Sequence, residues 1–495
     1  MTIDDAPGAS QAPSTTPTVV HDAAGAKLRG NLGTTSLVFT VIAYNGPLIV
    51  LAGLVPLVIA FGNGSAAPST FLIMGVLVAI FAVGLNAMAL RMKHAGAFYT
   101  YVTAGIGRSA GLSAGAIAII AYVTLCAGTM ILFAASFQHL LTDVFGIEGG
   151  PPWPVWAAVG WAVVSGLGLY NVELSAKVLG TASSLEIVLA VIWNIRVYID
   201  GGPEGRSVDV LGSLFSGNPA FALVLAILCL TGFESLQVFR AETKDSSRTV
   251  PRATFISIGL LTAMYVISSY AYIVAYGASK AATAGAEDPT GSVLASMAQY
   301  VAKPAADIAN ILLTTSCLAA CLAITNILGR YIFALGRDGV LPRRLGEANP
   351  RHGSPMAATA VAAAIHFAVI AVVVISGLSA AAGFASLTAF GAYCLILLYV
   401  VTSAAIFAFF LKRREPGISK WKAFVAPLLA TLGMAAIAYL STVNFAGVLG
   451  QSQTVANICL LIIAVAVVLG LAAGLWIRRS RPEVYAQIGN QHSEP

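Results

Sequence analysis

Two carboxylates stand inside long apolar stretches of the chain, where an ionised acid is costly to bury. Glu234 lies in the sequence TGFES at 231–235, which interrupts an apolar segment that begins at Phe221, and Glu186 lies in the run LEIVL at 185–189. An ionised carboxylate at the centre of a bilayer costs roughly 2.5 to 3.5 kcal/mol on insertion scales, so it usually faces a cavity, a partner or a transport pathway. The two acids therefore indicate binding or proton chemistry at membrane depth.

A second interruption lies closer to the N-terminus. The apolar run 38–43 is followed by YNGP at 44–47, and a further apolar run covers 48–57. Proline lacks an amide donor and its ring clashes with the preceding turn, so we expect the helix to unwind here. Pro47 suits the first position of the continuing half-helix, which leaves the amides of Leu48 and Ile49 free to face a ligand.

The elements that must hold these residues are membrane helices. Hydrophobic residues make up 58% of the 495 positions and charged residues 10%, and apolar stretches of the roughly 20 residues that cross a bilayer recur along the chain. The runs are continuous and do not alternate in polarity, which favours helices over a β-barrel. We predict an all-α integral membrane protein with about twelve transmembrane helices at 36–60, 68–90, 109–141, 154–171, 175–199, 219–240, 253–277, 304–335, 355–377, 381–411, 423–446 and 453–477.

The two interrupted helices are the first and the sixth, with four uninterrupted ones between them. This pattern is what a five-plus-five inverted repeat produces, with spans one and six crossing at the midplane. Glycine and proline kinks without function are the alternative for each break alone. We predict one transporter domain at 31–477, with repeat one at 36–200, repeat two at 219–411 and two extra helices at 423–477.

The distribution of lysine and arginine predicts the orientation. With this placement, all but four of the 27 basic residues lie on one side or at its helix ends, the exceptions being Arg196, Arg206, Lys280 and Lys303. Because positive loops stay inside, both termini are predicted to be cytoplasmic in the plasma membrane. Residues 1–30 are predicted to form a disordered cytoplasmic tail, and residues 478–495 a cytoplasmic C-terminal tail. The net charge of +6 then reflects topology and not nucleic-acid binding.

The motifs that would indicate an enzyme or an ATP-driven pump are absent from the sequence, so we predict that the protein is not an enzyme. The spans contain no HExxH or GxSxG pattern and no paired nucleophile and base, and the chain has no GxxxxGK[ST] loop. We predict no metal and no cofactor. The six cysteines have no ligand-like pairing and are interpreted as packing residues. His139 and His366, without carboxylate or cysteine partners at ligand spacing, are interpreted in the same way.

Several blocks together resemble the amino acid–polyamine–organocation (APC) permeases. They are 231–235 followed by AETK at 241–244 and RTVPRA at 248–253, AGAFYTYV at 95–102 after the second span, RYIFALGRDGVLP at 330–342 after the eighth, and SP at 354–355 opening the ninth. In this order they cover roughly 36–477. The resemblance implies a leucine-transporter-like secondary transporter of twelve helices, with amino acids as the usual cargo and the substrate held at broken helices one and six.

Carried onto this chain, the resemblance gives a set of substrate-binding residues. The positive ends of half-helices suit a carboxylate, and exposed carbonyls at an unwound segment accept from an ammonium. Many family members have a Gly-rich GxG-like step in span one, whereas YNGP here includes Pro47 without a donor, so a full amide cradle is not implied. Tyr44 and Asn45 either bond the ligand or satisfy the broken backbone. The predicted set is Tyr44, Asn45, Gly46, Leu48, Ile49, Thr231, Gly232 and Phe233, with Tyr122 and Phe390 flanking the pocket.

The two acids are candidates for ion or proton coupling. The resemblance places Glu186 where several proton-coupled members have a lysine, between spans one and eight. There it could exchange a proton, balance a cation, help ligate sodium, or be a structural acid paired with a span-eight hydroxyl: Thr314, Thr315 or Ser316. Glu234 is expected to stitch the unwound region or to control protonation, and Phe233 to form a lid, a pocket wall or plain packing.

These observations predict a secondary active transporter for amino acids or related amines that works by alternating access. Its expected partners are the small-molecule cargo, a proton or sodium ion or an exchanged substrate, and the lipid bilayer. A non-transporting nutrient receptor or binding subunit on the same fold is the alternative. Two intramembrane acids could suit a cationic cargo, but charge alone does not decide its identity.

Overall fold

The computed structural model describes residues 33–92, 98–170, 176–243, 245–349, 355–413 and 417–488, and these segments contain helices and no extended strand. Ten helical segments within them are long and apolar enough to cross a membrane, and a shorter apolar helix, α6 (Trp153–Leu169), adds to these. The all-α prediction is therefore confirmed for the described part of the chain. The tail 1–30, the motif residues 95–97, 244 and 354, and residues 489–495 lie outside it.

The helix bounds follow the predicted spans within a few residues at most ends. The first half of the chain forms α1 (Thr34–Asn45), the π-helical η1 (Ile49–Leu54) and η2 (Val58–Asn63) around α2 (Val55–Leu57), η3 (Gly64–Ala66), α3 (Ala67–Ala89), α5 (Arg108–His139) with η4 (Leu140–Val144), α6, and α7 (Ala176–Asp200). The second half forms α8 (Pro219–Leu228) with η5 (Phe233–Glu242), α9 (Ser246–Tyr276), α12 (Lys303–Arg337), α13 (Met356–Ile375), α14 (Ala380–Arg413), η7 (Trp421–Val425) with α15 (Ala426–Val443), and α17 (Gln453–Ser480).

The largest difference from prediction concerns the seventh span. It was expected to start at residue 253, but α9 begins at Ser246 and carries Pro251 inside its second turn. Length and hydropathy also give no sign of the short helices, which are α4 (Phe98–Gly105), α10 (Ala281–Glu287), α11 (Pro289–Tyr300), η6 (Arg343–Gly346), α16 (Phe445–Leu449) and α18 (Pro482–Gln487). The described part of the predicted C-terminal tail, 478–488, is thus largely helical, formed by the end of α17 and by α18.

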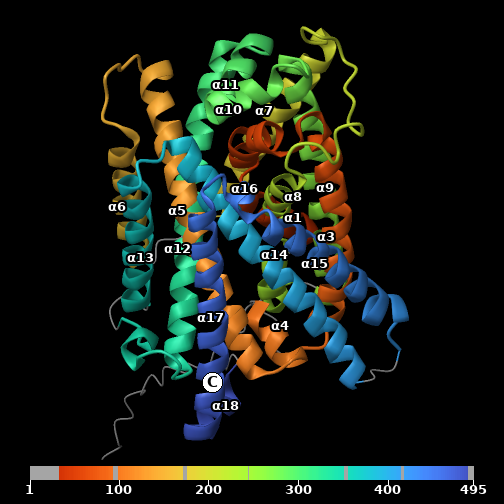
Figure 1. Ribbon diagram of the computed structural model, residues 1–495, viewed down its shortest axis with the longest axis vertical. Coiled ribbons are helices and arrows are strands. Elements are labelled where there is room, and N and C mark those ends of the chain that lie inside the picture. The colour runs from red at the N-terminus through yellow and green to blue at the C-terminus, as the bar shows by residue number, and fades with distance from the viewer. Residues whose placement is uncertain are drawn as a thin grey trace, which may run out of the picture.

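The short helices cap the two ends of a bundle of long ones. Figure 1 shows α10 and α11 at one end and α4 and α18 at the other, with α5, α12, α14 and α17 running between them. Charge follows the same division. Helices α12, α14 and α17 end at the α4 and α18 end with Arg337, Lys412 and Arg478, whereas Lys280 and Lys303 flank α10 and α11. The basic clusters therefore gather at one end of the bundle.

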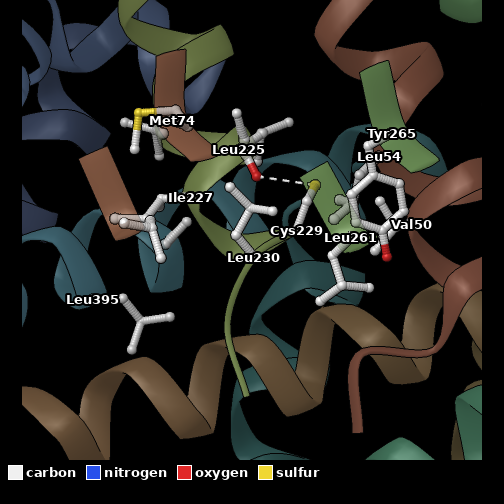
Figure 2. Packing of buried hydrophobic residues seen from close by; sticks show 14 of the residues in the cluster. Val50, Leu54, Met74, Leu225, Ile227, Cys229, Leu230, Leu261, Tyr265 and Leu395 are labelled. Carbon is white, nitrogen blue, oxygen red and sulfur yellow. Dashed lines mark hydrogen bonds between the residues drawn. The ribbon is translucent and has the colours of Figure 1, made fainter. Parts of the chain in front are cut away.

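The hydrophobic core surrounds the point where α8 ends. Figure 2 shows Leu225, Ile227, Cys229 and Leu230 surrounded by side chains of other helices, which are Met74, Val50, Leu54, Leu261, Tyr265 and Leu395. The Cys229 thiol donates to the Leu225 carbonyl at 3.2 Å, and the Cys229 amide donates to the same carbonyl at 3.3 Å. The core therefore holds an interrupted helix in place from several sides.

Close approach of α4 to α14 depends on one glycine. A Cβ atom at Gly105 would lie 2.1 Å from the backbone oxygen of Ala405 and 2.8 Å from its Cα. Both atoms belong to the backbone of a long helix, which cannot move aside as a flexible side chain can. The Gly105 carbonyl also accepts from the Lys412 ammonium at 2.8 Å.

We predict that Gly105→Ala separates α4 from α14 and destabilises the protein by about 1–3 kcal/mol, the usual cost of overpacking. The measurement is the melting temperature of purified protein in detergent. Gly115→Ala is the matched control, because a Cβ there meets only the Tyr99 Cβ at 3.9 Å. Equal melting temperatures of the two variants would contradict the packing argument.

Candidate functional site

Helix one breaks at Gly46, as the sequence predicts. Gly46 adopts a left-handed conformation with φ 61° and ψ 83°, and its amide donates to the Ile42 carbonyl, which closes α1. Helical geometry resumes at Pro47, and the continuing half contains the π-helical turns of η1. The first interruption is therefore a true change of direction and register in the backbone.

Helix six breaks at the matching place. Helix α8 ends at Leu228, and the chain continues as the 3-10 turns of η5 from Phe233. Between them Gly232 has φ 102°, a conformation that favours glycine. A Cβ at Gly232 would lie 2.7 Å from Cδ1 of Tyr44, so the ring of Tyr44 packs directly on this backbone. The two interruptions are in contact.

Asn45 joins the two breaks. Its side-chain amide donates to the carbonyls of Cys229 at 2.8 Å and Thr231 at 3.3 Å, and Tyr265 of α9 donates to its Oδ1. Asn45 is buried, so these bonds satisfy carbonyls that the end of α8 leaves without helical partners. Of the two roles left open for Asn45, the structure shows the backbone one.

The Glu186 side chain, from α7, contacts the start of the second half of helix one. The amide of Leu48 donates to Glu186 Oε2 at 3.0 Å, and Ser316 of α12 donates to Glu186 Oε1. The prediction of a free Leu48 amide is therefore wrong, because a buried carboxylate of α7 already uses it. An anion at this position is favoured by the amides and dipole of a helix N-terminus.

Three hydroxyls were predicted as possible partners of Glu186, and the prediction is wrong for Thr314 and Thr315. The hydroxyls of Thr314 and of Ser136 in α5 form a hydrogen bond, with their oxygens 2.6 Å apart. Thr315 is exposed and donates back to the carbonyl of Ile311 at 2.9 Å. Ser316 alone among the three faces α7, since adjacent positions on a helix point in different directions. The contact tying α7 to both helix one and α12 thus runs through Glu186 and Ser316.

Glu234 is expected to stitch the unwound region to neighbouring helices, and its hydrogen bond with Gly232 lies within its own break. The Gly232 amide donates to Glu234 Oε2 at 2.9 Å. Four tyrosine rings lie within electrostatic range of the carboxylate: Tyr44, Tyr122, Tyr331 and Tyr399. The Tyr399 hydroxyl is close to it but outside ordinary hydrogen-bond geometry. Unlike the fully buried Glu186, Glu234 is only partly buried.

A cavity of about 300 Å³ lies beside the two breaks. Its volume is at the lower limit of small-molecule pockets. The predicted residues that line it are Tyr44, Asn45, Ile49, Tyr122, Thr231 and Glu234; the remaining described lining residues are Ser36, Phe39, Thr40, Ala43, Val50, Leu54, Leu125, Thr129, Leu179, Leu228, Ala319, Ala320, Ala323, Ile324, Phe384, Thr388 and Leu395. Six of the predicted substrate or coupling residues therefore meet at one cavity.

Other predicted residues lie outside the cavity lining. Phe233 is fully buried and packs edge-on against Phe81, and Phe390 packs edge-on against Phe445. The part of α14 that faces the cavity is the stripe Phe384, Thr388 and Leu395, which sequence reasoning missed. Helix α14 is apolar on all sides, so no periodic signal in the sequence sets which face points inward. Gly46, Leu48 and Gly232 are also absent from the lining.

The prediction that His139 has no carboxylate partner is wrong. Its Nδ1 lies 3.2 Å from Asp143 Oδ2, one turn along, and its Nε2 lies 3.2 Å from Oδ2 of Asp288 at the start of α11. Burial raises the pKa of Asp288, but the hydrogen bond and charge of His139 outweigh it, and the pKa is lowered overall. His139 therefore fastens the α10–α11 cap to α5. Asp288 is distant in sequence, which hid this pairing.

The cysteines are unpaired within the described residues, and five of the six are buried, in agreement with packing. Cys126 and Cys321 each direct the thiol toward the other's carbonyl at 3.7 Å across α5 and α12. His366 lies beside Cys126, so it too has a cysteine neighbour that spacing in the sequence did not indicate. The described residues contain no group of three potential metal ligands.

Comparison with known proteins supplies the family. The model of a family described as amino acid permeases matches residues 30–478. The low-affinity putrescine importer PlaP of Escherichia coli is 26% identical over 303 residues, which are 58% of this chain and 63% of the importer. An uncharacterized transporter of Mycobacterium tuberculosis is 26% identical over 401 residues, 79% of this chain and 81% of that one. The branched-chain amino acid permease BcaP of Lactococcus lactis is 23% identical over 311 residues, 57% and 63% of the two chains. The match to PlaP and to BcaP therefore spans less than two thirds of either relative.

We predict that Asn45→Ala destabilises the junction of the two breaks by about 1–3 kcal/mol, because it leaves buried carbonyls and the Tyr265 hydroxyl without partners. Tyr265→Phe removes only one of these bonds, so a loss near 1 kcal/mol is expected. Thermal unfolding in detergent measures both. Asn457→Ala on the exposed face of α17 is the control for loss of an amide. An Asn45→Ala melting curve that overlays the control would contradict the bridging role.

Proposed function

Because the chain belongs to the amino acid permease family, we propose that it is a secondary active transporter that moves amino acids or related amines across the plasma membrane by alternating access. The observation that carries this proposal is the small-molecule-sized cavity at the contact of two broken helices. Discontinuous helices place peptide donors and acceptors at membrane depth without leaving them in lipid. The relatives, which include a putrescine importer and a branched-chain amino acid permease, agree with this cargo class.

The proposed architecture has twelve membrane helices in two inverted repeats. Helices α1 to α7 would form repeat one and α8 to α14 repeat two, with α15 and α17 as the extra pair. Support comes from the position of the breaks, since each falls in the first long helix of its half. The basic helix ends near α4 and α18 support a cytoplasmic location for that end and for both termini.

The proposed conformation is open toward the cytoplasmic end. The cavity lining runs along α1 from Asn45 back to Ser36, whose side chain is exposed. At the opposite end, α10 and α11 pack against η1, α2 and η2. His139 and Asp288 fasten this cap. An inward-open, outward-closed shape is one of the two end states that alternating access requires.

Glu186 is proposed to couple cargo movement to protons. Its carboxylate accepts from Leu48 in helix one and from Ser316 in α12. Protonation removes the negative charge that strengthens the bond from the Leu48 amide, while the protonated oxygen can donate to the Ser316 hydroxyl. A weaker bond to Leu48 would let helix one move relative to α7, which links the proton to the opening of the cavity. Thr231, Tyr44 and Tyr122 are proposed to contact the cargo.

Transport itself is tested with purified protein in proteoliposomes. We predict uptake of labelled amino acids or amines by the unaltered protein and none by Ala320→Trp, because the indole would fill the cavity. Ile311→Trp, on the exposed face of the same helix, is the matched control and retains uptake. Cargo that stabilises the protein to heat but never crosses the bilayer would instead support the receptor or binding-subunit alternative.

The coupling role gives a separate prediction. Glu186→Gln lacks the titratable group, so accumulation driven by an imposed pH gradient should fall to the level of empty vesicles while exchange of internal for external cargo persists. Glu287→Gln in the exposed α10 is the charge-matched control. Accumulation that survives in Glu186→Gln would remove Glu186 from coupling, and accumulation that follows a sodium gradient alone would replace the proton with sodium.

A further inference from the structure

We infer that the cargo is a monoamine, meaning one ammonium group on an apolar body without a carboxylate. This inference rests on the proposed transport function and narrows its substrate class. It follows from which hydrogen-bonding groups at the two breaks are already used, and from which charges the cavity lining contains.

Three donors at the two breaks, which are the backbone amides of Leu48 and Gly232 and the side-chain amide of Asn45, bind groups of the protein itself. Pro47 has no amide hydrogen, the Leu48 amide donates to Glu186, and the Gly232 amide donates to Glu234. The side-chain amide of Asn45 donates to the carbonyls of Cys229 and Thr231. In each break, a glutamate thus uses a backbone amide that could otherwise bind the carboxylate of an amino acid.

Charge in the cavity points the same way. The described lining residues include no lysine, arginine or histidine, and one acid, Glu234. A carboxylate brought in by an amino acid would lose water without gaining a cationic partner, and it would share the cavity with a glutamate of like charge. An ammonium group would instead meet an opposite charge. The lining therefore selects against the anionic half of a zwitterion.

Aromatic rings complete a site for a cation. Tyr44 and Tyr122 line the cavity with Glu234, and Tyr331 packs on Tyr122 with ring centroids 5.8 Å apart. The quadrupole of an aromatic ring attracts a cation that approaches its face, and a desolvated site strengthens this attraction. A partly buried carboxylate among tyrosine rings is a chemically suitable place for an ammonium group.

The remainder of the cavity favours a cargo with a single ammonium group. Beyond Glu234, its walls are largely apolar, with Ile49, Leu125, Ile324 and Phe384 from four different helical segments. The polar side chains there are neutral: the amide of Asn45 and hydroxyls such as those of Thr129 and Thr388. A second ammonium group on a diamine would find no second carboxylate among the described lining residues. An apolar body such as a branched alkyl or phenyl group fits these walls.

The test compares three labelled five- or six-carbon compounds in proteoliposomes: isoamylamine, leucine and cadaverine. Leucine adds a carboxylate to the isoamylamine skeleton, and cadaverine has an unbranched five-carbon chain with an ammonium group at each end. We expect isoamylamine to be taken up with a half-saturation concentration at least about tenfold lower than either of the others. Leucine uptake equal to or better than isoamylamine overturns the inference but leaves transport standing. Cadaverine uptake equal to or better than isoamylamine overturns the single-charge part.

A variant separates this inference from the transport proposal. Glu234→Gln keeps an acceptor for the Gly232 amide but removes the negative charge, so the half-saturation concentration for isoamylamine should rise at least about tenfold. Glu287→Gln is the control, and thermal unfolding checks that Glu234→Gln is folded. Unchanged isoamylamine uptake in a folded Glu234→Gln overturns the role of Glu234. If no amino acid or amine crosses with the unaltered protein, the proposed function itself fails.

Discussion

The structure depends on the need to satisfy backbone groups where two membrane helices stop inside the protein. Lipid offers no hydrogen bonds, so every amide and carbonyl exposed by a break must find a partner in the chain. Here Asn45 takes the carbonyls after α8, Glu186 takes the amide after Pro47, and Glu234 takes the Gly232 amide. These polar contacts explain why costly residues stand in apolar segments.

The same contacts join helices that would have to move against one another in a transport cycle. Glu186 links α7 to helix one and to α12, and Asn45 links helix one to the break after α8 and to α9. Each is a small set of directional bonds in an otherwise apolar interior. A change in one bond can therefore favour a different packing of whole helices, because close-packed interfaces tend to adopt discrete arrangements.

Sequence reasoning located the breaks well, because proline, glycine and an acid in an apolar run are local signals. It also placed most helix ends within a few residues, since hydrophobic length is counted along the chain. It did not find which face of α14 lines the cavity, because that helix is apolar all round. It also missed the contacts of Leu48 with Glu186 and of His139 with Asp288, whose partners are 138 and 149 positions apart in the chain. Such pairs depend on packing and leave no periodic trace in one sequence.

The wall that α12 gives to the cavity contains three small side chains, Ala319, Ala320 and Ala323, beside Ile324. They stand on a different helix from Glu234 and from the residues that close the two breaks. Side-chain volume could therefore be added on this wall by single substitutions that replace no residue of the polar junction. During evolution of such a protein, selectivity for the size of the cargo, set by the alanine wall, and selectivity for its charge, set by Glu234, can change independently.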